Sequence, residues 1–197
     1  MSTLQREVGG RSGRILVAAA KLCAQQGIAE TNLRQIAREA SVSNGTVHYY
    51  FPSKDELIET MIVRAVEPMG KQAAEIASRE GDPFSQIAAI IELSFGLFDN
   101  DWDLYYVALL LGDHVRVRLT DEFPTATGAL KTIIENGQRQ GLVRSGDAHL
   151  LAIQCHGIIM RVARARAFGE LSPPLLRFAE SVAESCRLML AVQFSSH

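Results

Sequence analysis

A group of polar and aromatic side chains between Arg34 and Lys54 has the chemistry needed to contact nucleic acid. Its members are Arg34, Ser43, Asn44, Gly45, Thr46, His48, Tyr49, Tyr50 and Lys54. Asparagine and threonine can hydrogen-bond to base edges, aromatic rings can meet a thymine methyl, and hydroxyl, imidazole and ammonium groups can reach phosphates. A glycine allows close approach of a partner, although it costs a helix roughly 1 kcal/mol relative to alanine. These residue types therefore indicate a DNA-reading surface.

Two short helices are expected to position these side chains. Apolar residues recur at the i, i+3, i+4, i+7 spacing of an amphipathic helix, at Leu33, Ile36, Ala37 and Ala40. We expect Thr31 to cap this helix and Ser43 to cap a second one over residues 44–50. The intervening residues 41–43 are long enough only for a turn. Two helices at this spacing predict a helix-turn-helix.

Residues 45–57 read GTVHYYFPSKDEL and resemble the signature of the TetR family of bacterial transcriptional regulators, with a close match over residues 11–60. The resemblance implies that Lys54 and the rings ending the second short helix contact DNA phosphates. It also implies that the other residues of the group lie at or near DNA. His48 stands where the family usually has tyrosine, but imidazole retains an N–H donor. Ser41 replaces the usual turn glycine, so we expect a positive φ there.

Charge is distributed unevenly along the chain. Residues 1–54 carry seven Lys/Arg and three acidic residues, a balance of +4, whereas the whole chain carries −2, so residues 55–197 carry −6. A basic segment followed by an acidic one fits an electrostatic footprint for DNA at one end. We therefore expect a DNA-binding domain over residues 1–54 and an effector-binding and dimerisation domain over residues 55–197.

The remaining periodicity predicts helices only, and so an all-α protein of about nine helices. The helix after the helix-turn-helix should begin with a Ser53–Glu56 capping box, and Pro68 should kink or end it. Asp82 and Pro83 are a suitable N-cap and first helical residue for the next helix. Outside the two short helices, helices are expected over residues 11–26, 54–68, 82–98, 102–119, 121–140, 147–168 and 172–194.

Aromatic residues concentrate in the middle of the chain, where a small-molecule effector could bind in an aromatic-lined cavity. The candidate ligand-binding residues are Phe95, Phe98, Trp102, Tyr105 and Tyr106, with His114 and His156 as polar groups. Ordinary core packing explains each ring equally well. His149 and His156 are two helical turns apart, about 10 Å, which is too far to share one ion. Neither a metal site nor a cofactor is expected.

The last two helices carry apolar stripes that fit a homodimer interface, at Leu150, Ile153, Gly157, Leu175, Phe178, Val182, Cys186 and Met189. Packing within a single chain is the alternative for both stripes. The TetR resemblance implies dimerisation through a four-helix bundle built from these two helices. A dimer would place two recognition helices about 34 Å apart on a palindromic double-stranded operator.

Other features exclude several classes of protein. No apolar run approaches the roughly 20 residues of a membrane span, and the polar, basic residues 1–14 contain no signal-peptide core, so we expect a cytoplasmic protein without membrane contact. Three widely spaced cysteines in apolar stretches argue against a disulfide framework, and we expect core residues, with redox sensing as the alternative. No spacing supplies a nucleophile with a base and an orienting partner, which argues against an enzyme.

These observations predict a ligand-responsive, sequence-specific DNA-binding transcriptional regulator. A repressor released from its operator by a small-molecule effector fits them best. The alternative is a helical protein-interaction module that does not bind DNA.

Overall fold

The computed structural model describes residues 10–109 and 123–192. Within these ranges the chain is helical, and the only strand-like pairing is an isolated bridge between Val143 and Ala191. The all-α prediction is therefore confirmed for the described residues. None of the helices in these ranges combines the length and apolar character that a bilayer span requires.

The chain forms two compact units. Unit 1 comprises Met1–Val66 and Asn100–Thr120, and unit 2 comprises Glu67–Asp99 and Asp121–His197. The division falls inside helix α5 (Lys54–Ala77). The functional boundary at residues 54/55 stays a prediction.

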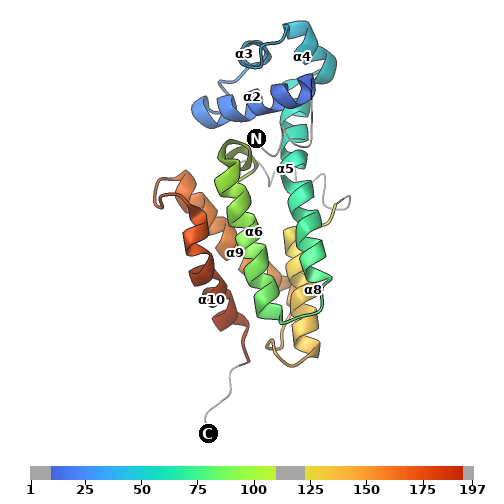
Figure 1. Cartoon of the computed structure of the whole chain (residues 1–197), viewed down its shortest axis with the longest axis vertical. Coiled ribbons are helices and arrows are strands. Elements are labelled where there is room, and N and C mark those ends of the chain that lie inside the picture. Colours follow the sequence, from blue (N-terminus) through green and yellow to red (C-terminus); the bar gives the residue numbers. More distant parts are fainter. Residues whose placement is uncertain (1–9, 110–122, 193–197) are drawn as a thin grey trace. The chain divides into compact units, whose positions relative to one another are not determined.

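Unit 1 contains three helices that contact one another, drawn in blue to teal in Figure 1. These are α2 (Arg11–Gln26), α3 (Leu33–Glu39) and α4 (Asn44–Tyr50). Each contributes apolar side chains that are almost fully buried, among them Ile15, Ile36 and Val47. At the surface, Lys21 Nζ lies 2.5 Å from a carboxylate oxygen of Glu39 and links α2 to α3.

The N-cap of α3 is Asn32, so the prediction of Thr31 was wrong. The Asn32 side chain accepts hydrogen bonds from the backbone N–H groups of Arg34 and Gln35, at 3.1 and 3.0 Å. The Gln35 side chain accepts in return from the Asn32 N–H at 2.8 Å. Thr31 is instead buried, and its hydroxyl donates to the carbonyl of Gly27. Because Thr31 is buried in the turn before α3, the next residue, Asn32, serves as the N-cap.

Unit 2 is built mainly from α6 (Pro83–Asn100), α8 (Ala126–Arg139), α9 (Ala148–Ala167) and α10 (Ala179–Leu190), with a short 3₁₀ helix η1 (Leu175–Phe178) before α10. Helix α9 contacts α8, η1 and α10 (Figure 1). The core of this unit contains large aliphatic and aromatic side chains with almost no exposure, including Ile87, Ile91, Phe95, Leu130, Ile133 and Ile159. The predicted N-cap Asp82 is confirmed by a hydrogen bond from the Ser85 N–H, and Asp147 caps α9 by accepting from the His149 and Leu150 N–H groups.

Pro68 does not end α5, which continues to Ala77. Downstream of the proline, Ala73 and Ala77 lie one turn apart and are buried. Packing of this stretch outweighs the single hydrogen bond that a proline removes. Gly70 allows close packing here, because a Cβ at that position would lie 1.8 Å from the carbonyl oxygen of Pro124.

Three other predicted helices differ from the observed ones. Helix α8 starts at Ala126 rather than near residue 121, because Pro124 disfavours helical geometry before it and Thr125 supplies the N-cap. The helix expected over 172–194 starts as η1 at Leu175 and ends at Leu190, after which Ala191 pairs with Val143. Of the helix expected over 102–119, residues 102–109 are helical and the rest lie outside the described residues.

Candidate nucleic-acid interface

The turn between α3 and α4 sets the orientation of the two short helices. Ser41 has a φ of 54°, which confirms the positive value expected for the residue at the usual glycine position. The Val42 N–H donates to the carbonyl of Ala37 at 3.0 Å and closes the end of α3. Ser43 then caps α4 by accepting from the Thr46 N–H at 3.0 Å. The helix-turn-helix expected from the sequence is therefore present.

Helix α4 has one buried position and a broad exposed face. Val47 has no exposed surface and anchors the helix to the core of unit 1. Tyr49 is 82% exposed, and its ring lies 5.2 Å from that of Tyr50 in an edge-on arrangement. The exposed face also includes Asn44, Gly45 and His48, while Thr46 is half-buried against the cap. Two adjacent tyrosines with 82% and 41% exposure gain little from folding, which suggests a role in binding.

Gly45 has no packing role within the chain. A Cβ built at this position would meet only the Ser43 hydroxyl oxygen, at an ordinary 3.8 Å. Glycine is therefore not required by the fold at the start of α4, where it lowers helix stability by about 0.8–1.0 kcal/mol relative to alanine. Close approach of an external partner at Gly45 stays a prediction.

The basic residues of the group lie on different parts of unit 1. The Arg34 side chain is exposed at the start of α3. Lys54 is half-buried, and its ammonium donates to the carbonyl of Ala29, in the turn between α2 and α3, at 3.3 Å. Lys54 thus ties this turn to the start of α5, and its contact with a phosphate stays a prediction.

The predicted effector residues fall into different environments. Phe95 and Phe98 on α6 are buried in unit 2. Tyr105 is buried in unit 1, where its hydroxyl donates to the carbonyl of Ala65 at 3.3 Å. Trp102 and Tyr106, also in unit 1, are half-buried with ring centroids 5.6 Å apart.

The two histidines of the predicted effector site add little to this picture. His156 on α9 is half-buried, and His114 lies outside the described residues. The described part of the chain contains no group of three or more His, Cys, Asp or Glu side chains that could hold a metal ion.

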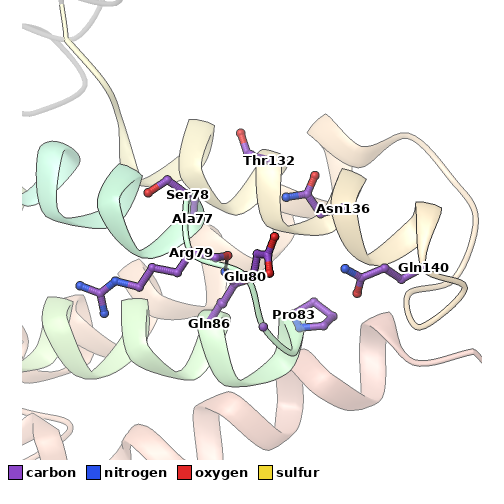
Figure 2. Close-up of a pocket in the computed structure, with 10 residues that line it drawn as sticks. Ala77, Ser78, Arg79, Glu80, Pro83, Gln86, Thr132, Asn136 and Gln140 are labelled. Atoms are coloured by element: carbon purple, nitrogen blue, oxygen red, sulfur yellow. Dashed lines mark hydrogen bonds between the residues drawn. The ribbon is translucent and has the colours of Figure 1, made fainter.

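A cavity of about 460 Å³ in unit 2 is lined by none of the predicted residues. Figure 2 shows Thr132, Asn136 and Gln140 along α8 on one side and Glu80 and Pro83 on the other. Gln86 closes its floor by donating to the carbonyls of Ile76 and Arg79. These polar side chains come from three separate segments with no shared motif, so no sequence signal identified the cavity.

The predicted dimer residues divide into exposed and buried groups. On α9, Leu150 is 53% exposed, Ile153 is 48% exposed, and Gly157 is exposed. Leu175, Val182 and Cys186 are buried in unit 2 and belong to its core, while Phe178 and Met189 are half-buried. Leu188 on α10, which was not among the predicted dimer residues, is 60% exposed. Helical periodicity identified apolar stripes but did not show which side of each helix packs inside the unit.

The cysteines are buried and reduced in this structure. The Cys155 and Cys186 thiols hydrogen-bond across α9 and α10, and this contact together with burial raises the pKa of Cys155. Burial likewise raises the pKa of Cys23, which lies in unit 1. Buried thiols of raised pKa, such as Cys155 and Cys23, are poor nucleophiles, and the burial of all three cysteines supports the prediction of core residues.

The helix-turn-helix region matches a known protein family. The family described as "Bacterial regulatory proteins, tetR family" matches residues 15–61, which include the helix-turn-helix. The transcriptional repressor KstR2 of Mycobacterium tuberculosis is 24% identical over 95 residues, 48% of this chain and 48% of the repressor. The chain thus matches about half the length of that curated relative.

Two solved structures resemble the chain over most of its length. The regulator FadR from Bacillus subtilis in complex with stearoyl-CoA has a TM-score of 0.74 and 22% identity, covering 88% of this chain and 96% of that chain. The SmeT–triclosan complex has a TM-score of 0.76 and 20% identity, covering 93% and 92%. At these identities the similarity establishes the fold. Residues 15–61, which include the helix-turn-helix, thus match the tetR family of bacterial regulatory proteins.

Proposed function

We propose that the protein is a ligand-responsive, homodimeric transcriptional repressor that binds a palindromic double-stranded operator. The observation that carries this proposal is the exposed face of α4, where Tyr49 is 82% exposed and Gly45 has no packing role, while Val47 fixes the helix on its core. A rigid helix with exposed groups suited to base edges and phosphates is what major-groove recognition requires.

Within this interface the residues have different roles. Asn44, Thr46 and Tyr49 are proposed to address bases, because they lie at and after the start of the recognition helix. Arg34, His48, Tyr50 and Lys54 are proposed to contact phosphates, with Ser43 positioning the helix as its cap. Lys54 would exchange its contact with the Ala29 carbonyl for a phosphate oxygen, which offers a charged acceptor.

The effector is proposed to be a small, mainly apolar molecule. FadR and SmeT were solved with stearoyl-CoA and triclosan, respectively, and both ligands have large apolar parts. In this chain, Trp102 and Tyr106 present half-buried rings that an apolar ligand could cover. Tyr105, already buried in the same unit, is proposed to support the packing around them, whereas Phe95 and Phe98 are buried in the core of unit 2.

The dimer is proposed to form through the exposed faces of α9 and α10. Leu150, Ile153 and Leu188 are 53%, 48% and 60% exposed, and Gly157 would permit close approach of a second copy. We further propose that the protein acts in the cytoplasm and has no catalytic activity of its own, as expected of a regulator whose partner is chromosomal DNA.

The test starts with selection of genomic fragments by the purified protein, followed by fluorescence anisotropy of the best duplex across a salt series. Wild-type protein should prefer the selected site over a scrambled duplex. Lys54→Ala should weaken binding to both duplexes and lower the slope of log affinity against log salt by about 0.9 for each phosphate that the variant no longer neutralises. Tyr49→Ala should reduce the preference between the two duplexes.

Lys71→Ala is the matched control, because Lys71 is also a lysine of α5 with an intramolecular contact, to Glu67 at 2.7 Å. It should leave DNA binding unchanged. Equal binding of the selected and scrambled duplexes by the wild-type protein, or its failure to bind either at low salt, would reject the proposal and favour a protein-interaction module.

A further inference from the structure

The carboxylate of Asp99, at the end of α6, joins three segments of unit 2. Its Oδ1 accepts from the Arg166 guanidinium at 2.6 Å and from the Leu175 N–H at 2.9 Å. Its Oδ2 accepts from the Leu176 N–H at 2.9 Å. The Asp99 and Arg166 side chains are only 16% and 13% exposed, so these charge-assisted bonds are largely shielded from water. We call Asp99, Arg166 and the two backbone N–H groups the Asp99 junction.

The junction replaces a cap that the local sequence cannot provide. Pro174 occupies the N-cap position of η1 and offers no side-chain acceptor, and Phe178 before α10 offers none either. The first N–H groups of a helix need acceptors from outside it. Here the acceptor comes from a residue more than seventy positions earlier in the sequence.

The same region of α6 also packs against η1. A Cβ at Gly96 would lie 3.6 Å from a methyl group of Leu176, which places this side chain directly over α6. One turn of α6 therefore holds both the backbone and a side chain of η1. Because η1 leads into α10 without an intervening residue, this contact fixes where α10 begins.

The Asp99 junction also holds the end of α9. Arg166 lies in the last turn of α9, so a single carboxylate links the end of α9 to the start of the η1–α10 segment. Leu150, Ile153 and Gly157 lie on the exposed face of α9, and Leu188 lies on that of α10. A self-complementary interface requires both faces to be presented in one fixed arrangement.

We infer that Asp99 is a positioning residue for dimerisation: it sets the packing of α10 against α9 and thereby the combined surface that meets a second copy. This inference rests on the proposed dimer. According to this inference, the Asp99 side chain lies outside the interface but changes the dimer affinity through the packing of α10.

The test compares variants of the full chain by sedimentation equilibrium over a dilution series. Asp99→Ala should raise the dimer dissociation constant about tenfold or more, equivalent to about 1.4 kcal/mol. Asp99→Asn, which keeps one acceptor oxygen, should give an intermediate value and serves if the alanine variant does not fold. Hydrogen exchange at the Leu175 and Leu176 amides should accelerate in the same order.

Thr125→Ala is the control for a general loss of stability. It removes the N-cap of α8 in the same unit, where Thr125 accepts from the Gly128 N–H at 3.0 Å. It should lower the melting temperature but leave the dissociation constant within about twofold of wild type, as expected for independent sites.

Three results would overturn the inference. A dimer of wild-type affinity in Asp99→Ala would reject it while leaving the proposed dimer intact, and an equal weakening in Thr125→Ala would show that any destabilisation has this effect. A wild-type chain that is monomeric at all concentrations would reject the dimer itself, and the inference with it.

Discussion

Gly157 provides a test that separates the stability of one chain from the affinity between two chains. It lies on the exposed face of α9, within a regular helix, and a Cβ at this position would have no neighbour within 4 Å. Alanine at an exposed helix position is about 0.8–1.0 kcal/mol more favourable than glycine. Gly157→Ala should therefore raise the free energy of unfolding of the dissociated chain by about 0.5–1 kcal/mol.

A larger side chain at the same position should in addition weaken association. Gly157→Leu has room in the single chain but would separate two α9 helices that pack closely at this point. Overpacking of a close contact costs about 1–3 kcal/mol, so the dimer dissociation constant should rise roughly 5- to 150-fold. Urea unfolding at low protein concentration measures the first quantity, and sedimentation equilibrium measures the second.

Thr132→Leu is the control for an exposed leucine, because it places the same side chain at an exposed position on α8. It should leave the dissociation constant unchanged. If Gly157→Leu were folded and dimerised as tightly as the wild-type protein, α9 would not meet a second copy at Gly157, and the proposed interface would be wrong.

Other predictions concern stability. Asn32→Ala removes the capping box of α3 and should lower the free energy of unfolding by about 0.5–2 kcal/mol in urea titrations. Gly70→Ala places a methyl group 1.8 Å from the Pro124 carbonyl oxygen and should destabilise the chain by about 1–3 kcal/mol or more, unlike Gly157→Ala; equal melting temperatures for the two would contradict this packing. Backbone N–H groups of Leu150 and His149 donate to the Asp147 carboxylate and lower its pKa. The stability that ionised Asp147 adds is therefore fully present above the ordinary aspartate pKa of about 3.9. It is lost as pH falls through the lower pKa of the folded chain. Asp147→Asn should flatten this part of the stability profile measured by thermal unfolding from pH 5 to 2, and an unchanged profile would assign the acid sensitivity to other groups.

Local sequence determined the helix-turn-helix and most helix starts. Ser43, Ser53 and Asp82 cap helices as expected, because a capping side chain reaches only two or three residues along its own chain. The positive φ of Ser41 was expected from the family resemblance, in which glycine usually occupies this turn position.

Long-range contacts decided what local patterns left open. Thr31 and Asn32 are both capable caps, and burial of Thr31 selected Asn32. The start of η1 depends on Asp99, a distant residue that no local pattern connects to Leu175.

The apolar stripes of α9 and α10 were likewise predicted from the sequence, but the tertiary structure decided which residues are buried. Periodicity predicted that α9 and α10 each have an apolar face, because side chains three and four residues apart share one side of a helix. It did not show that Cys186 faces the core while Leu150 faces outward. Which side of a helix is buried depends on the neighbouring helices, and that arrangement exists only in the folded chain.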